Sequence, residues 1–110
     1  MIELTDAPHG MERSFGGDTL NTAVYLARLG AKQGIEVDYI TAVGDDPYSQ
    51  EMINAWSSEG IGVKTVRQIS NAMPGLYAIR TTQQGERSFF YWRSASAARQ
   101  MFEGVEGKRL

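Results

Sequence analysis

The residues best suited to chemistry lie in the segment Gly16-Gly17-Asp18-Thr19-Leu20-Asn21. Glycines let a ligand approach the backbone, and free amides at the start of a helix favour oxygen-rich or anionic groups. Asp18 and Asn21 could exchange hydrogen bonds with several hydroxyl groups, as sugar recognition requires. The spacing alone nevertheless favours a plainer interpretation, in which Asp18 or Thr19 caps a helix. The segment is not a P-loop, because no Gly-Lys-Ser/Thr follows it.

A second candidate is the run Phe89-Phe90-Tyr91-Trp92-Arg93. Alternation along a strand puts Tyr91 and Arg93 on one face and Phe90 and Trp92 on the other, so one face could be core and the other a site. A guanidinium beside a phenol suits recognition of a carboxylate, because it offers two parallel hydrogen bonds. An aromatic ladder with a solvated arginine fits the pattern equally well.

Other polar residues are better explained by structure. His9 is the only histidine, and it lacks a nearby histidine or cysteine with which to bind a metal. Asp45 and Asp46 follow a predicted parallel strand, where α/β sheets place ligands, but we favour a capping role at the next helix. Tyr77 alone is more typical of a packed strand residue than of a ligand contact. No nucleophile and base have a recognisable spacing, so we expect no catalytic residue in this chain.

The elements that must position these residues begin as an alternation of helices and strands. Residues 2–4 could end a strand, and a polar turn follows. Apolar spacing predicts a helix over residues 19–29, a parallel strand buried on both faces over 37–43, and a helix between Pro47 and Gly60. This order is typical of an α/β layer.

The second half of the chain changes character. The β-rich runs 63–69, 76–81 and 87–92 predict an antiparallel meander, and residues after Ser94 could begin a helix. We therefore predict one partial domain in three parts. Residues 1–62 form an incomplete α/β part, residues 63–94 form the meander, and residues 95–110 form the start of a helix and a truncated tail.

Composition excludes several classes of protein. A chain of 110 residues that is 42% hydrophobic can bury a core. A net charge of −2 gives no basic field for nucleic acid, and no apolar run approaches the roughly 20 residues of a membrane span. Cysteine is absent, and the first residues do not form a signal peptide. We expect a cytoplasmic protein with neither nucleic acid nor a membrane as partner.

Three stretches together carry a resemblance to a known family: FGGDTLNTAVYLARLG, YITAVGDDPYSQEMINAW and GLYAIRTTQQGERSFFYWRSASAA. They resemble the amino-terminal third of ribokinase-like (PfkB-type) carbohydrate kinases, and among these the 2-keto-3-deoxygluconate kinases most. The resemblance implies an α/β fold, with part of a parallel sheet flanked by helices and an antiparallel β-meander lid. It implies that the full-length kinase phosphorylates a keto-deoxy sugar acid with ATP. A fructokinase or ribokinase specificity is the alternative.

In such kinases the first segment contacts the sugar and the meander covers it. The resemblance therefore implies a set of substrate contacts: Gly17, Asp18, Thr19, Leu20, Asn21, Tyr77, Tyr91 and Arg93. Arg93 is the candidate partner of the carboxylate of the sugar acid. The resemblance also implies that the full-length protein forms a homodimer through the lid.

The chain departs from the family pattern at both ends. Most of the first strand of the family is missing before Met1, and no Gly-x-Gly-Asp motif, which would hold the catalytic aspartate and the ATP site, occurs up to Leu110. We expect ATP and Mg²⁺ to bind the full-length kinase and not this chain alone, which should be inactive by itself. The other hypotheses are a non-catalytic binding or dimerisation module, and a fragment that does not fold alone.

Overall fold

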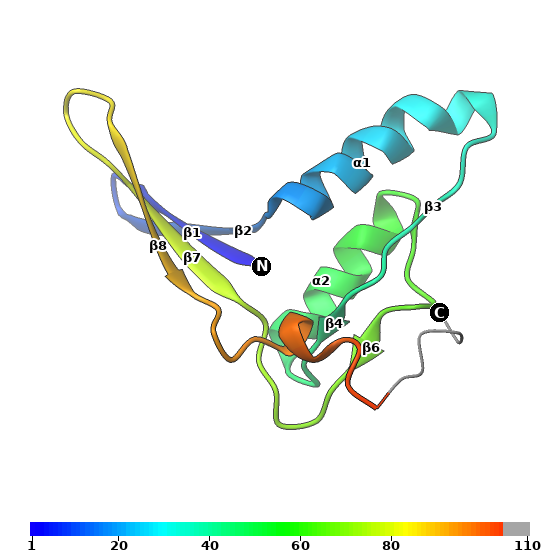
Figure 1. Cartoon of the computed structure of the whole chain (residues 1–110). Coiled ribbons are helices and arrows are strands. Elements are labelled where there is room, and N and C mark those ends of the chain that lie inside the picture. Colours follow the sequence, from blue (N-terminus) through cyan, green and yellow to red (C-terminus); the bar gives the residue numbers. More distant parts are fainter. Residues whose placement is uncertain (105–110) are drawn as a thin grey trace.

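The computed structural model describes residues 1–104 of the chain. One side of the molecule is a four-stranded sheet, and the other side holds the two α-helices and four strands of two residues each (Figure 1). No helix in this part of the chain is long and apolar enough to cross a membrane.

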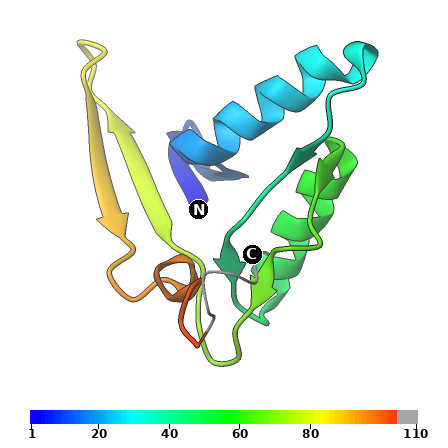
Figure 2. The same cartoon turned by 45° about the vertical axis from the view of Figure 1, so that its right-hand side comes forward.

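The four-stranded sheet, called the lid sheet below, has the strand order β2-β1-β7-β8. Strands β1 and β2 form a hairpin, β1 lies parallel to β7, and β7 pairs antiparallel with β8. Figure 2 shows the β7-β8 hairpin, coloured yellow to orange, extending away from helix α1. The bounds of these strands are β1 (Ile2–Ala7), β2 (Gly10–Phe15), β7 (Leu76–Thr81) and β8 (Arg87–Trp92).

Helices α1 (Asp18–Gly30) and α2 (Pro47–Ser58) confirm the two predicted helices. A short 3-10 helix, η1 (Ala31–Gln33), follows α1. Both helices turn an apolar face to a shared core, and burying each large side chain there stabilises the fold by about 1.5–3 kcal/mol. The buried members of this core are Ile2, Leu20, Ala23, Ala27, Val43, Met52, Trp56 and Ile61.

The strand predicted over residues 37–43 is present as two short pieces. Its first piece, β3 (Val37–Asp38), pairs in parallel with β5 (Ile61–Gly62). Its second piece, β4 (Ala42–Val43), pairs in parallel with β6 (Arg67–Gln68). Between the pieces Ile40 is 48% exposed. The expectation of a strand buried on both faces is therefore wrong for its first half, where Ile40 reaches solvent, and is confirmed for β4.

The prediction that residues 63–69 join an antiparallel meander is wrong. This run carries β6, which pairs in parallel with β4 and lies outside the lid sheet. The lid sheet takes strands β1 and β2 instead, and β2 was not predicted. A β-branched run fits a parallel or an antiparallel partner equally well, so its local pattern did not determine its pairing. The division of the chain at residues 62 and 94 stays a prediction.

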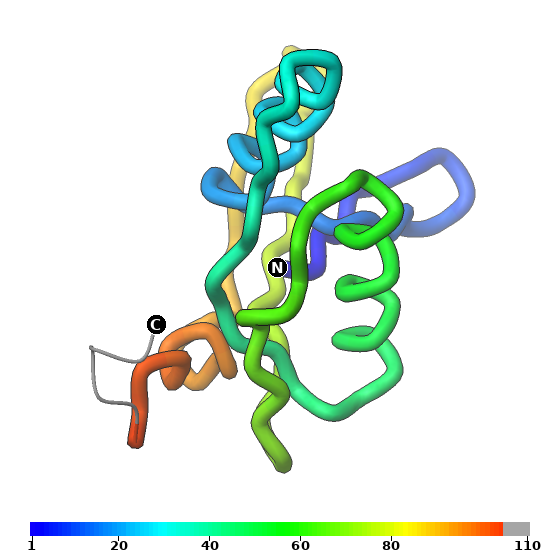
Figure 3. Tube along the Cα trace, turned by 90° about the vertical axis from the view of Figure 1, so that its right-hand side faces the viewer, coloured from blue at the N-terminus to red at the C-terminus, as the bar shows by residue number. Residues whose placement is uncertain are grey.

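After β8 the chain turns back toward β4. The expected helix start is a 3-10 helix, η2 (Ala97–Gln100), and Figure 3 shows this orange turn beside the end of β4. Ala97 packs there with Ala42 and Ala72 in a second, small core. Arg67 donates hydrogen bonds to the carbonyl oxygens of Met101 and Glu103, at 2.9 and 2.8 Å. The predicted tail continues to residue 110, and its residues 105–110 lie outside the described part.

Asp46 caps helix α2, which confirms the favoured role of this acid. Its carboxylate accepts hydrogen bonds from the backbone N–H of Ser49 at 2.9 Å and from the Ser49 hydroxyl at 2.7 Å. The Ser49 oxygen in turn accepts from the Gly44 N–H at 2.9 Å, and Ser49 is fully buried. Burial raises the pKa of Asp46, but the hydrogen bonds from Ser49, together with those from the backbone N–H groups of Asp46 and Tyr48, outweigh it and hold this pKa below its ordinary value.

The Ser49→Ala substitution is expected to lower the free energy of unfolding by about 1–2 kcal/mol, because the Gly44 amide and Asp46 both lose a partner. The pKa of Asp46 is lower in the folded state than in the unfolded state. Its contribution to stability is therefore present above the unfolded pKa and is lost as the pH falls through the folded pKa. Urea unfolding at about pH 3 and about pH 7 measures both effects. Ser57→Ala on the exposed side of α2 is the control, and equal stability of Ser49→Ala and the wild type at neutral pH would contradict the assignment.

Candidate functional site

A wide cleft lies between the inner face of the lid sheet and the helical part of the molecule. Its volume is about 1250 Å³, above the roughly 300–1,000 Å³ of typical small-molecule pockets. Strands β1, β7 and β8 form one wall, and the start of α1, residues 37–43 and α2 form the other. The cleft is large enough for a sugar acid.

Two glycines bring the chain from β2 into α1 at the edge of this cleft. Gly17 has a φ of 123°, in the region that favours glycine, and it occupies the N-cap position of α1. Gly16 is buried against the Tyr77 hydroxyl so closely that no Cβ would fit there. Gly17 therefore allows the chain to turn into α1, and Gly16 allows the backbone to approach the Tyr77 hydroxyl closely.

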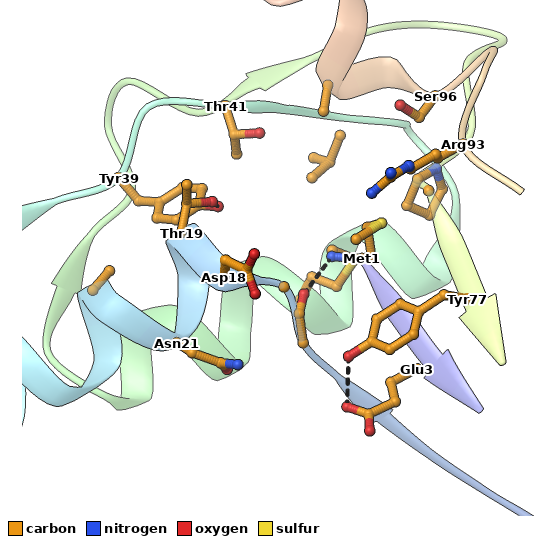
Figure 4. A pocket seen from close by; sticks show the side chains of 18 of the residues that line it. Met1, Glu3, Asp18, Thr19, Asn21, Tyr39, Thr41, Tyr77, Arg93 and Ser96 are labelled. Atoms are coloured by element: carbon orange, nitrogen blue, oxygen red, sulfur yellow. Dashed lines mark hydrogen bonds between the residues drawn. The ribbon is translucent and has the colours of Figure 1, made fainter. Parts of the chain in front are cut away.

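Asp18 is the first residue of α1, and no side chain caps this helix. The interpretation of Asp18 or Thr19 as a helix cap is therefore wrong. In Figure 4 the carboxylate of Asp18 points into the cleft, and Asn21 lies beneath it on the same side of α1. A spacing of three residues on a helix keeps both side chains on one face. Both polar groups are thus available to the hydroxyls of a ligand.

The remaining residues of this segment have other contacts. The Thr19 hydroxyl shares a hydrogen bond of 2.7 Å with the hydroxyl of Tyr39, and both residues line the cleft. Leu20 is 4% exposed and lies in the core, away from the cleft. The structure brings every predicted contact residue except Leu20 to the cleft. Their binding of a substrate stays a prediction.

An aromatic stack supports Arg93 on the inner face of the lid sheet. Tyr77 and Tyr91 lie opposite each other in the β7-β8 register, and their ring centroids are 5.9 Å apart. The Arg93 guanidinium carbon lies 4.2 Å from the centroid of the Tyr91 ring, a contact worth about 0.5–1 kcal/mol at an exposed site. Tyr91 and Arg93 thus belong both to the predicted aromatic ladder and to the predicted carboxylate site. The other face of β8 is not core, since Phe90 and Trp92 are 47% and 61% exposed.

The cleft offers groups of both charges. Arg93 lines it from the end of β8, and Asp18 lines it from α1. This arrangement suits a ligand with an anionic end and several hydroxyls, because a guanidinium pairs with a carboxylate and the acid accepts hydrogen bonds from hydroxyls. Within residues 1–104, no group of three or more His, Cys, Asp or Glu side chains could hold a metal ion.

A family model described as "pfkB family carbohydrate kinase" matches residues 2–105. The chain belongs to this family. Over 110 residues it is 46% identical to a 2-dehydro-3-deoxygluconokinase of Dickeya dadantii. That match covers the whole chain and 36% of the relative, so the chain spans about a third of its length.

Solved structures confirm the predicted ribokinase-like α/β fold of this pfkB-family chain. A 2-dehydro-3-deoxygluconokinase of Thermotoga maritima matches with a TM-score of 0.77 at 17% identity, over 96% of this chain and 36% of that protein. A fructokinase of Xylella fastidiosa with bound ATP matches with a TM-score of 0.76 at 24% identity, over 89% of this chain and 32% of that protein. At these identities the likeness shows the fold alone.

Sequence reasoning missed Glu3, which lines the cleft of this kinase-family chain. Its Oε2 atom accepts a hydrogen bond of 2.9 Å from the Tyr77 hydroxyl, 74 residues away. Burial, together with this bond and the charge of Glu3, raises the pKa of Tyr77 to about 12. No local pattern predicts such a pair. Only the parallel pairing of β1 with β7, which sets Glu3 beside Tyr77, could have indicated it.

Proposed function

We propose that this chain forms the sugar-binding cleft and lid of an ATP-dependent kinase that phosphorylates 2-keto-3-deoxygluconate, a keto-deoxy sugar acid. The observation that carries the proposal is the position of Arg93. Its guanidinium lies over the Tyr91 ring and points into the cleft that Asp18 faces from α1 (Figure 4). The 46% identity to a kinase named for this substrate, also called 2-dehydro-3-deoxygluconate, supports the same choice.

The described residues would bind and orient the sugar. Arg93 would pair with the carboxylate, while Asp18 and Asn21 would bind hydroxyls on the opposite wall. Contacts at both ends of the sugar would hold it in one orientation. Such positioning lowers the barrier to a transfer reaction. ATP would supply the phosphoryl group. Residues 1–104 contain no group of three or more His, Cys, Asp or Glu side chains that could hold a metal ion by themselves.

The alternative is a fructokinase-type or ribokinase-type specificity. Fructose and ribose are neutral, so Arg93 would have no anionic group to bind. Among residues 1–104 no acidic side chain forms an ion pair with Arg93 in place of a ligand. An unpaired guanidinium on the wall of a cleft favours an acidic substrate over a neutral one.

A chimera tests this proposal, in which the chain replaces the matched segment of the Dickeya dadantii relative. We expect ATP-dependent phosphorylation of 2-keto-3-deoxygluconate, with a kcat/KM at least about a hundredfold above that for fructose or ribose. The unmodified relative is the control for expression and assay. A folded chimera that prefers fructose or ribose would contradict the proposed substrate.

We also propose that the lid sheet forms the contact of a homodimer. Strand β8 is an edge strand, and the exposure of Phe90 and Trp92 on its outer face supports the proposal. Sedimentation equilibrium of the purified chain should give twice the chain mass, and Trp92→Ser should shift the equilibrium toward monomer. A monomer at every concentration would argue against this contact.

A further inference from the structure

We propose that Glu3 is a positioning residue for the carboxylate-binding end of the cleft. Glu3 holds Tyr77, and the stack of Tyr77 on Tyr91 then fixes the guanidinium of Arg93. This inference rests on the proposed function, since it assumes that the cleft binds a sugar acid at Arg93.

The first link joins Glu3 on β1 to Tyr77 on β7. The two residues are neighbours in the parallel register, and the Tyr77 hydroxyl donates to Glu3 Oε2 at 2.9 Å (Figure 4). Tyr77 is 8% exposed. A hydrogen bond to an ionised acceptor is stronger than one between neutral groups, so this bond holds the ring in one position.

Gly16 closes the other side of the Tyr77 hydroxyl. A Cβ at this position would clash with the hydroxyl and would lie 2.8 Å from Glu3 Oε2. The hydroxyl is therefore enclosed by the Glu3 carboxylate and by the Gly16 backbone. Because Gly16 immediately precedes Gly17 and Asp18, the same contact ties the lid sheet to the start of α1.

The second link runs from Tyr77 to Arg93. Strand β8 is exposed along its whole length, so the buried ring of Tyr77 supplies the fixed surface against which Tyr91 stacks. Tyr91 then carries the Arg93 guanidinium 4.2 Å from its centroid. A tyrosine that is free to move would release Tyr91, and with it the arginine.

Because Glu3 is charged, the direction in which Glu3→Gln changes the ligand affinity tests the positioning role. Glu3 is an acid that lines a cleft for another acid, so its charge alone opposes binding of the ligand. Removing that charge without changing the shape of the side chain should tighten binding if Glu3 acts only through its field. The positioning role predicts the opposite, because the amide of glutamine holds the Tyr77 hydroxyl less firmly.

The test is isothermal titration of the Glu3→Gln chain with 2-keto-3-deoxygluconate. We expect about tenfold weaker binding than in the wild type. Glu12→Gln makes the same chemical change on exposed β2, outside the cleft, and should leave the affinity unchanged. The Glu3→Gln/Tyr77→Phe double variant should bind no more weakly than the weaker of the two single variants, since Glu3 acts through Tyr77.

Binding by Glu3→Gln that equals or exceeds that of a binding-competent wild type would overturn the inference and leave the proposed function standing. A folded wild-type chain that does not bind the acid would overturn the proposed function, and the inference with it. Urea unfolding tests the first link without a ligand. We expect the shift in midpoint of the double variant to be smaller than the sum of the two single shifts, and additive shifts would overturn the link between Glu3 and Tyr77.

Discussion

Replacing Arg93 with alanine is expected to weaken binding of 2-keto-3-deoxygluconate by about a hundredfold, or about 2.7 kcal/mol. The substitution removes the charged hydrogen-bond donors that face the carboxylate of the ligand. Arg93→Lys should fall between alanine and the wild type, because lysine keeps the charge but loses the planar fork and the stacking on Tyr91. Isothermal titration of the purified variants measures both changes.

The matched control for this experiment is Arg80→Ala. Arg80 lies on β7, its side chain is 75% exposed, and its nitrogen is 3.4 Å from Asp6 rather than in the cleft. Its removal should leave the affinity unchanged, since exposed ion pairs contribute little. An Arg93→Ala chain that is folded and binds as tightly as the wild type would show that the carboxylate lies elsewhere.

Gly16→Ala is expected to lower the free energy of unfolding by about 2–3 kcal/mol and to weaken binding of the sugar acid. The added methyl group would overlap the Tyr77 hydroxyl and crowd the Glu3 carboxylate, so these side chains or the backbone at Gly16 must shift and the bond between Tyr77 and Glu3 is strained. Urea unfolding followed by circular dichroism measures the stability. Titration with the ligand then measures the affinity of the folded fraction.

A second substitution shows whether the clash has the stated cause. In a Tyr77→Phe background the hydroxyl is gone, so Gly16→Ala should lower the free energy of unfolding by less than it does in the wild type. Gly10→Ala is the control, because a Cβ there meets nothing within 4 Å and its cost reports only the backbone strain of a φ of 139°. A Gly16→Ala chain as stable as the wild type would contradict the close contact between Gly16 and the Tyr77 hydroxyl.

Local signals in the sequence were enough to predict both helices. Apolar spacing, followed by a glycine near each end, predicted α1 and α2, and Asp46 before Pro47 predicted the cap of the second. Strict alternation over residues 89–93 also placed Tyr91 and Arg93 on one face. Each of these features depends on residues within a few positions of one another.

Features that depend on distant pairing could not be predicted in this way. The run 63–69 was assigned to the wrong sheet, because its side chains suit either partner. The polar turn predicted after residue 4 is wrong at Asp6, which lies in β1. Strand β2 has no local signal, since Met11 to Ser14 show no apolar alternation and lie exposed at an edge. The bond between Glu3 and Tyr77 exists only because β1 lies beside β7.

The candidate site was predicted only in part from the residues themselves. Composition and spacing left Asp18 open as a cap or a ligand contact, and left Arg93 open as a solvated or a binding side chain. Family resemblance supplied the functional interpretation. The structure then placed these residues on facing walls of one cleft, while Leu20 lies in the core because helical periodicity turns it away from Asp18 and Asn21.

The claim that this chain by itself carries the sugar-acid site is tested most directly by isothermal titration of the purified wild-type chain with 2-keto-3-deoxygluconate. Circular dichroism of the same sample shows whether the chain is folded. We expect saturable binding of one ligand per chain, and much weaker binding of fructose under the same conditions. A folded chain that does not bind the acid, or that binds fructose equally well, would contradict the claim.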